Sequence, residues 1–282
     1  MLRTDLRRFA RHNNEQGDWM IQVFKWAGMA LTAALLAACG GGDGGGELVL
    51  PEANTLCNSL GVQPKIINGA DCAQPERSPV VLLLSLGSTG ETQSCSGVML
   101  TPTRVLTAAH CMPAGTQRMA AVQWKANGSG SLVYATSWVA HPGYTPNGEG
   151  LQNDAGVVTL RSALSNPSMP LLVSTPSKVG DEVFIAGWGL PGQNLAVGYA
   201  RITKVTESHV GYVYKGQGSN TCSGDSGGPA YRGIGGPAGV VGITSSGSIE
   251  GCGDGDNSLY TNIQTPRVLD FIRAQAPGLA EI

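Results

Sequence analysis

The stretch with the clearest chemical potential is Gly224-Asp-Ser-Gly-Gly-Pro229, in which Ser226 stands between glycines and directly after Asp225. A serine in such a run is a poor core residue. Glycines let the chain turn sharply and present backbone N–H groups where a negatively charged oxygen would form. The run therefore predicts a nucleophilic serine in a site that stabilises an oxyanion.

The order of residues along the chain limits which fold can carry this serine. The spacing Gly224-x-Ser226-x-Gly228 also fits the nucleophile elbow of α/β-hydrolases, in which the acid and the histidine follow the serine. Here all four histidines precede Ser226, at His12, His110, His141 and His209. A serine hydrolase built on Ser226 must therefore take its histidine from upstream.

The composition indicates the kind of scaffold that holds the site. The chain of 282 residues has 41 glycines and only 13% charged residues, which favours an all-β, turn-rich, exported protein. Short β-type runs follow Ile66, for example at 80–84, 98–100, 120–124, 157–160, 183–186, 210–214 and 240–243. A C-terminal helix is expected from the cap Thr265, from Pro266 in its first turn and from an apolar face that includes Val268, Leu269 and Ile272. The net charge of −2 argues against a nucleic-acid partner.

The N-terminal part predicts export. A basic segment at 20–25 precedes an apolar one at 26–38, which is too short to span a bilayer. The motif Leu36-Ala-Ala-Cys39 resembles a bacterial lipoprotein signal, in which Cys39 receives the lipid. The alternative is an ordinary signal peptide that ends near a cysteine. We expect a signal peptide at 1–38, with Met20 as a possible start, and a glycine-rich tether and propeptide at 39–65. Lipid on Cys39 would anchor the protein to the bacterial cell envelope, in the outer membrane; without lipid it would be secreted.

Four motifs in order then identify a family. Thr107-Ala-Ala-His-Cys111, Asn153-Asp154 before an apolar strand, Gly187-Trp-Gly189 and the Ser226 run together resemble the trypsin/chymotrypsin-like serine proteases. The resemblance implies a protease domain over 66–282, with two six-stranded antiparallel β-barrels and the active site in the cleft between them. It implies a catalytic triad in which His110 is the general base, Asp154 orients it and Ser226 attacks a peptide bond. The N–H groups of Gly224 and Ser226 would form the oxyanion hole.

The same resemblance implies a zymogen. Lys65-Ile-Ile-Asn-Gly69 matches the family's activation site. Cleavage after Lys65 would free the ammonium of Ile66, which would insert beside Asp225 and organise Gly224. The alternative is that this segment is an uncut loop and Asp225 a turn residue. The partners would be a protein or peptide substrate and an activating protease.

The cysteines are sorted by the resemblance. With Cys39 set aside, six remain, and the family pattern implies Cys95–Cys111 and Cys222–Cys252. We expect Cys57 and Cys72 to pair across the activation bond; the alternative is that Cys57 is free or pairs between chains. We expect no metal and no cofactor.

Substrate choice is the weakest part of the resemblance. Asn220 takes the usual place of the residue at the base of the specificity pocket, which predicts a neutral pocket and no self-activation at Lys65. Ser245, Ser246 and Gly247 would bind the substrate backbone, and Ser258 would form the opposite wall. The neutral prediction would change if the loop with Asp254 and Asp256 folds inward. The function expected is a serine endopeptidase that works through an acyl-enzyme; the alternatives are a non-catalytic surface lipoprotein on the same scaffold and an esterase with the same triad.

Overall fold

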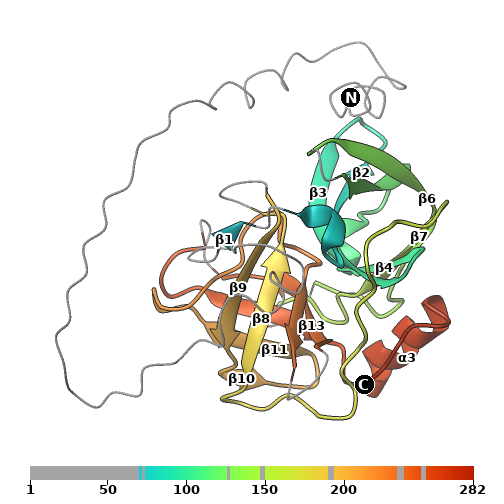
Figure 1. Cartoon of the computed structure of the whole chain (residues 1–282). Coiled ribbons are helices and arrows are strands. Elements are labelled where there is room, and N and C mark those ends of the chain that lie inside the picture. Colours follow the sequence, from blue (N-terminus) through green and yellow to red (C-terminus); the bar gives the residue numbers. More distant parts are fainter. Residues whose placement is uncertain are drawn as a thin grey trace, which may run out of the picture.

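The computed structural model describes residues 70–71, 74–125, 128–146, 150–189, 194–233, 238–248 and 252–282. They form two β units that lie side by side, with one helix at the C-terminus (Figure 1). The all-β class expected from the sequence is confirmed. The sequence calls at Cys39, Cys57, Lys65, Ile66 and Cys72 lie outside the described residues.

The first unit is a closed barrel of six antiparallel strands in the order β2-β3-β4-β7-β6-β5. Its strands are β2 (Val80–Leu86), β3 (Thr92–Thr101), β4 (Arg104–Thr107), β5 (Arg118–Trp124), β6 (Gly130–Ala140) and β7 (Gly156–Leu160). Pairing of β2 with β5 closes the ring. Closure leaves no free edge, which protects the barrel from pairing with other chains.

The second unit is an eight-stranded sheet in the order β1-β9-β8-β12-β13-β14-β11-β10. Its strands are β1 (Ala70–Asp71), β8 (Glu182–Gly187), β9 (Ala196–Arg201), β10 (Lys204–Val205), β11 (His209–Val213), β12 (Pro229–Arg232), β13 (Gly239–Ser246) and β14 (Asn257–Asn262). Only Ile202 and Thr203 separate β9 from β10 along the chain. In the sheet, however, β9 is the second strand from one edge and β10 is the strand at the other edge. The sheet is therefore curled. It has six main strands if β9 and β10 count as one and the two-residue β1 is left out, and the predicted second barrel takes this form.

Trp188 joins the two units. It is 5% exposed and belongs to a buried cluster with residues of both units, such as Val98 and Ile243. Its indole N–H donates to the carbonyl of Val80 at 3.2 Å, and its ring stacks on that of Trp124 with 5.4 Å between centroids. A buried indole normally needs such an acceptor. The contact fixes the two units against each other where their loops form the site.

The C-terminal helix α3 (Pro266–Gln275) begins where the sequence predicts, with Thr265 at the N-cap. Its buried residues are Val268, Leu269 and Ile272. Two short 3₁₀ turns complete the elements, η1 (Pro75–Arg77) and η2 (Ala109–Cys111). None of the helices in the described part of the chain has the length and apolar composition needed to span a membrane.

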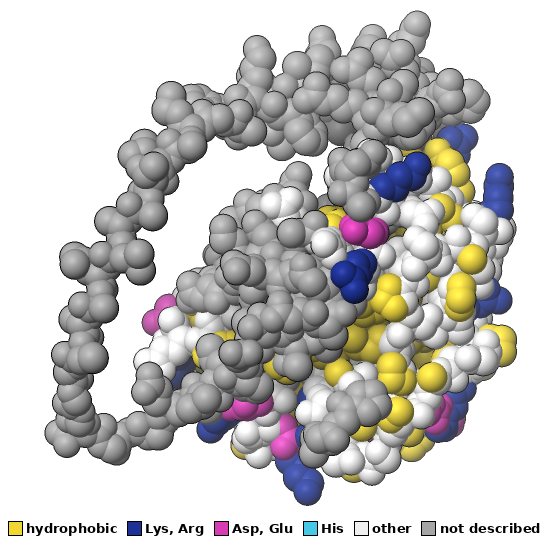
Figure 2. Space-filling model, in the orientation of Figure 1, with side chains coloured by type: hydrophobic (Ala, Val, Ile, Leu, Met, Phe, Trp, Pro, Cys, Tyr) yellow, Lys and Arg dark blue, Asp and Glu magenta, His cyan; other side chains and the backbone are white. Residues whose placement is uncertain are grey.

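On the face drawn in Figure 2, basic side chains stand apart from one another around the margin of the closed barrel, with hydrophobic side chains between them. Acidic side chains are interspersed on the same face. This mixture agrees with the net charge near zero.

Candidate active site

His110 is held in the turn η2, directly after strand β4. Its backbone N–H donates to Oδ1 of Asp154 at 2.9 Å, and its ring Nδ1 lies 2.7 Å from Oδ2 of the same carboxylate. The disulfide Cys95–Cys111 ties the next residue to strand β3. Since a carboxylate is an acceptor, these contacts assign the ring proton to Nδ1 and leave Nε2 with the lone pair.

Asp154 is fully buried two residues before β7 begins. In addition to the bonds from His110, Oδ2 of Asp154 accepts a hydrogen bond from the hydroxyl of Ser245 at 2.7 Å. Its backbone carbonyl accepts the hydroxyl of Thr261 at 2.9 Å. Both hydroxyls come from the second sheet, while His110 belongs to the first barrel. The carboxylate is therefore satisfied by donors from both units, as a buried charge requires.

Ser226 lies half-buried in the loop between Cys222 and Gly228. Its carbonyl accepts the N–H of Ser96 from the first barrel at 2.8 Å, and the N–H of Gly227 donates to Thr244 of the second sheet at 2.8 Å. Gly227 has φ = 80°, and a Cβ there would overlap the side chain of Thr107 and the backbone of Ser96. Glycine is therefore required for this loop to pack against the first barrel.

The loop places Ser226 near the histidine without a direct bond. The sulfur of Cys111 lies 3.7 Å from the carbonyl oxygen of Ser226. Within the described residues, no hydrogen bond joins the ring of His110 to the hydroxyl of Ser226. Such bonds are often long in enzymes without substrate and tighten when substrate binds.

The backbone N–H groups of the loop fall into two sets, those that donate a hydrogen bond within the fold and those that do not. Those of Asp225, Gly227 and Gly228 donate within the fold, whereas those of Gly224 and Ser226 have no acceptor among the described residues. Gly224 has φ = 95°. The hydroxyl of Ser96 donates a hydrogen bond to the carbonyl oxygen of Gly224 at 2.9 Å. Two N–H groups without an internal partner beside a serine hydroxyl form an arrangement suited to an oxyanion.

Asp225 is 1% exposed, and its carboxylate lies against the backbone of Gly187 and Gly189. Its Oδ1 accepts the N–H of Gly189 and its Oδ2 that of Cys222, each at 2.8 Å. Burial raises the pKa of Asp225 to about 7, although the N–H groups of Cys222 and Gly189 act to lower it. No Lys, Arg or His side chain of the described ranges forms a salt bridge with this carboxylate.

A pocket of about 340 Å³ opens beside Ser226. Its lining includes the predicted Ser245, Ser246 and Gly247, and also Asp256. The disulfide Cys222–Cys252, implied by the family pattern, is present at its wall.

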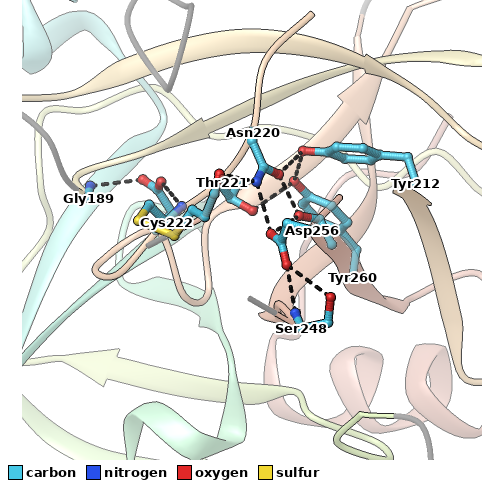
Figure 3. The surroundings of a disulfide bond; sticks show 11 residues. Gly189, Tyr212, Asn220, Thr221, Cys222, Ser248, Asp256 and Tyr260 are labelled. Atoms are coloured by element: carbon cyan, nitrogen blue, oxygen red, sulfur yellow. Dashed lines mark hydrogen bonds between the residues drawn. A yellow bond between two sulfur atoms is a disulfide. The ribbon is translucent and has the colours of Figure 1, made fainter. Parts of the chain in front are cut away.

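Asn220 and Ser258 are not in the lining of this pocket. Both are buried behind Asp256, where Asn220 Nδ2 donates to Oδ2 of Asp256 at 2.9 Å and Ser258 donates to the same oxygen at 3.0 Å (Figure 3). Asn220 therefore lies behind the carboxyl group of Asp256, which lines the pocket in its place. The neutral pocket expected from Asn220 stays a prediction.

Asp256 is the residue that sequence reasoning left undecided. The available signal was a pair of aspartates, Asp254 and Asp256, on one glycine-rich loop. The structure separates them: Asp254 is exposed, whereas Asp256 is 1% exposed and its backbone N–H and C=O bond to Gly253 and Tyr214. Which of the two points inward depends on tertiary contacts that composition does not encode.

One group near the site has the residue types of a metal centre. The ligand atoms of Cys95, His110 and Cys111 lie within 4.8 Å of one another. The two sulfurs are joined in a disulfide, so they are not the thiolates that bind metal ions. His110 is engaged with Asp154. The donor set therefore does not suit a metal.

Comparison with known proteins identifies the family. A family model described as trypsin matches residues 66–272. Brachyurin from Leptuca pugilator is 30% identical over 210 residues, covering 64% of this chain and 87% of that protein. A trypsin-like protease from Streptomyces glaucescens is 28% identical over 271 residues, covering 86% and 92%. Human kallikrein-12 is 29% identical over 244 residues, covering 76% and 92%.

Proposed function

Because the chain belongs to the trypsin family and is a serine endopeptidase of that type, we propose that His110, Asp154 and Ser226 are its catalytic triad and that it is made as an inactive precursor. The observation that carries the proposal is the buried carboxylate of Asp154, which accepts both the backbone and the ring of His110 beside the Ser226 loop. A serine hydroxyl needs such an oriented base to attack an amide.

In the acylation step, the hydroxyl oxygen of Ser226 attacks the carbonyl carbon of the scissile bond, and its proton passes to Nε2 of His110. The carbonyl oxygen becomes an oxyanion that accepts the open N–H groups of Gly224 and Ser226. The tetrahedral intermediate then collapses, and the C–N bond breaks. The leaving amine takes the proton from His110, which leaves an ester on Ser226.

In the deacylation step, water attacks the ester carbon while His110 accepts one of its protons. The C–O bond to Ser226 breaks, the serine recovers the proton and the carboxylic acid leaves. Asp154 remains a carboxylate throughout and stabilises the imidazolium that forms twice per cycle. Its burial strengthens this interaction, because the dielectric constant is lower than in water.

The precursor state follows from Asp225. Cleavage after Lys65 frees the ammonium of Ile66, which pairs with the buried carboxylate. The raised pKa of Asp225 supports this, because a carboxylate that is costly to ionise in the uncut chain gains most from a cation. Since Gly224 and Ser226 flank Asp225, the new ion pair orders the oxyanion hole.

Export and anchoring complete the proposal. The signal peptide is removed before Cys39, and lipid on this residue holds the enzyme at the cell envelope, where it meets protein substrates. A disulfide between Cys57 and Cys72 keeps the propeptide attached after activation. A non-reducing gel of the cleaved protein tests this pairing; release of the propeptide without reductant contradicts it.

The catalytic assignment is tested on precursor cleaved between Lys65 and Ile66. Wild-type protein should hydrolyse a peptide library and react covalently with a fluorophosphonate. Ser226→Ala should abolish labelling and lower kcat by several orders of magnitude, because triad residues act as a unit. Ser137→Ala, on the exposed side of β6, makes the same chemical change away from the site. Hydrolysis of esters but not peptides would indicate an esterase, and no Ser226-dependent turnover would indicate a binding protein.

A further inference from the structure

We propose that Ser96 is a positioning residue for the oxyanion hole, because its hydroxyl holds in place the peptide group that follows Gly224. The inference rests on the proposed function of Ser226 and adds one residue to it. Ser96 lies in strand β3 of the first barrel and is 0% exposed. A buried hydroxyl needs hydrogen-bond partners, and both partners of this one lie outside the first barrel.

The hydroxyl of Ser96 accepts one hydrogen bond and donates another. Its oxygen accepts the backbone N–H of Trp188 at 2.8 Å. Its proton goes to the carbonyl oxygen of Gly224, with 2.9 Å between the two oxygens. The bond from Trp188 uses a lone pair of the hydroxyl and so favours the orientation in which the proton faces Gly224. In the described part of the chain, no other donor reaches that carbonyl.

The backbone of Ser96 is fixed independently of its hydroxyl. Its N–H donates to the carbonyl of Ser226 at 2.8 Å, and its carbonyl accepts the hydroxyl of Thr107 at 2.7 Å. Within the sheet, Ser96 pairs with Leu82 of β2. The hydroxyl therefore projects from a rigid strand, and its removal leaves these backbone bonds in place.

The carbonyl that Ser96 holds belongs to the peptide group between Gly224 and Asp225. The N–H of the same peptide group donates to the carbonyl of Cys222 at 2.9 Å, so both sides of this peptide plane are bonded. Gly224 has φ = 95°, a region that glycine enters freely. Without the bond from Ser96, rotation about Gly224 would turn its N–H away from the site. The hydroxyl opposes this rotation, and an oxyanion hole is effective because its donors are aimed before the charge forms.

The expected effect falls on kcat, because the oxyanion exists in the tetrahedral states and not in the bound substrate. Loss of one whole oxyanion donor lowers kcat by about 100- to 1,000-fold. Ser96 acts on one donor through a neighbouring peptide group, so we expect a smaller loss of about 10-fold. Since no bond joins Ser96 to His110 or Asp154 in the described residues, the pH at which kcat/KM is half-maximal should not change.

The first experiment measures kinetics on precursor cleaved between Lys65 and Ile66, with the best anilide substrate of the peptide library. Ser96→Ala should lower kcat by about 10-fold and leave KM and the midpoint pH unchanged. Ser96→Thr keeps the hydroxyl and should restore most of kcat. Ser94→Ala removes a hydroxyl from an exposed position of the same strand and should behave as wild type.

The second experiment separates the oxyanion from the bound substrate. A peptide trifluoromethyl ketone adds the hydroxyl oxygen of Ser226 to its carbonyl carbon. The serine proton passes to His110, and the ketone oxygen becomes an oxyanion. The alcohol of the same peptide binds without this addition. Ser96→Ala should raise the inhibition constant of the ketone by the factor that kcat/KM loses, and leave that of the alcohol unchanged.

A third measurement needs neither turnover nor a folded Ser96→Ala enzyme. In cleaved Ser226→Ala protein, NMR relaxation dispersion reports motion of the Gly224 amide on the microsecond-to-millisecond time scale. With Ser96 intact, this amide should show no such exchange. When Ser96→Ala is added and the protein still unfolds cooperatively in urea, exchange should appear at Gly224.

The outcomes distinguish the two proposals. A loss of kcat at constant KM, with weaker ketone binding and rescue by threonine, supports the role of Ser96. An unchanged kcat in folded Ser96→Ala enzyme, an equal weakening of ketone and alcohol, or exchange at Gly224 while Ser96 is intact overturns it. If no hydrolysis depends on Ser226, the proposed function fails. The NMR comparison then decides by itself whether Ser96 orders the peptide group that follows Gly224.

Discussion

Ser245 donates its hydroxyl to Oδ2 of Asp154 at 2.7 Å, and that same oxygen lies 2.7 Å from Nδ1 of His110. One carboxylate oxygen therefore joins strand β13 of the second sheet to the turn η2 of the first barrel. Since Asp154 and His110 both belong to the first barrel, a shift between the two units would pull Ser245 away from the carboxylate. The bond from Ser245 opposes such a shift.

Replacing Ser245 with alanine should lower kcat by about 10-fold, because a hydrogen bond to a charged group contributes roughly 1.5–3 kcal/mol. KM should change less, since the hydroxyl of Ser245 is already bonded to Asp154, although the residue lines the pocket. Steady-state kinetics on a peptide anilide measures both constants. Ser137→Ala is the matched control. An unchanged kcat would mean that His110 and Asp154 alone maintain the geometry.

Gly227 should tolerate no side chain. Gly227→Ala adds left-handed strain of about 1–2 kcal/mol and an overlap with Thr107 and the backbone of Ser96, which costs a further 1–3 kcal/mol or so. Gly90 has a similar φ of 90° and nothing within 4 Å of an added Cβ. Gly90→Ala should therefore lower the free energy of unfolding by the backbone strain alone.

Urea denaturation of the two alanine variants gives both free energies of unfolding. The difference between them isolates the packing of the nucleophile loop against the first barrel. Equal losses for Gly227→Ala and Gly90→Ala would show that the loop relaxes away from the barrel without cost.

The residues around Ser226 and His110 were predictable because each lies in a short motif whose local geometry is fixed by glycines, a disulfide or a strand end. The C-terminal helix was predictable for the same reason, from Thr265 and Pro266 at its start. The pocket floor was not. Its chemistry depends on how the loop from Cys252 to Ser258 folds against Asn220, and hydrogen bonds between residues about 40 positions apart in sequence decide that.

Asp225 should give the uncut precursor a distinctive dependence on pH. Burial raises its pKa from the ordinary value of 3.8 to about 7, so the folded chain binds this proton more tightly than the unfolded chain. Its contribution to stability is present at pH below about 4 and is lost as the pH rises towards 7. The slope is at most about 1.4 kcal/mol per pH unit.

The measurement compares urea unfolding of Ser226→Ala precursor with and without Asp225→Asn, between pH 4.5 and 7.5 or so. The alanine substitution prevents self-cleavage in both proteins. The free energy of unfolding should fall with pH more steeply when Asp225 is present. After cleavage at Lys65 this difference should shrink, because the ammonium of Ile66 lowers the pKa of Asp225. A difference that does not vary with pH contradicts the raised pKa.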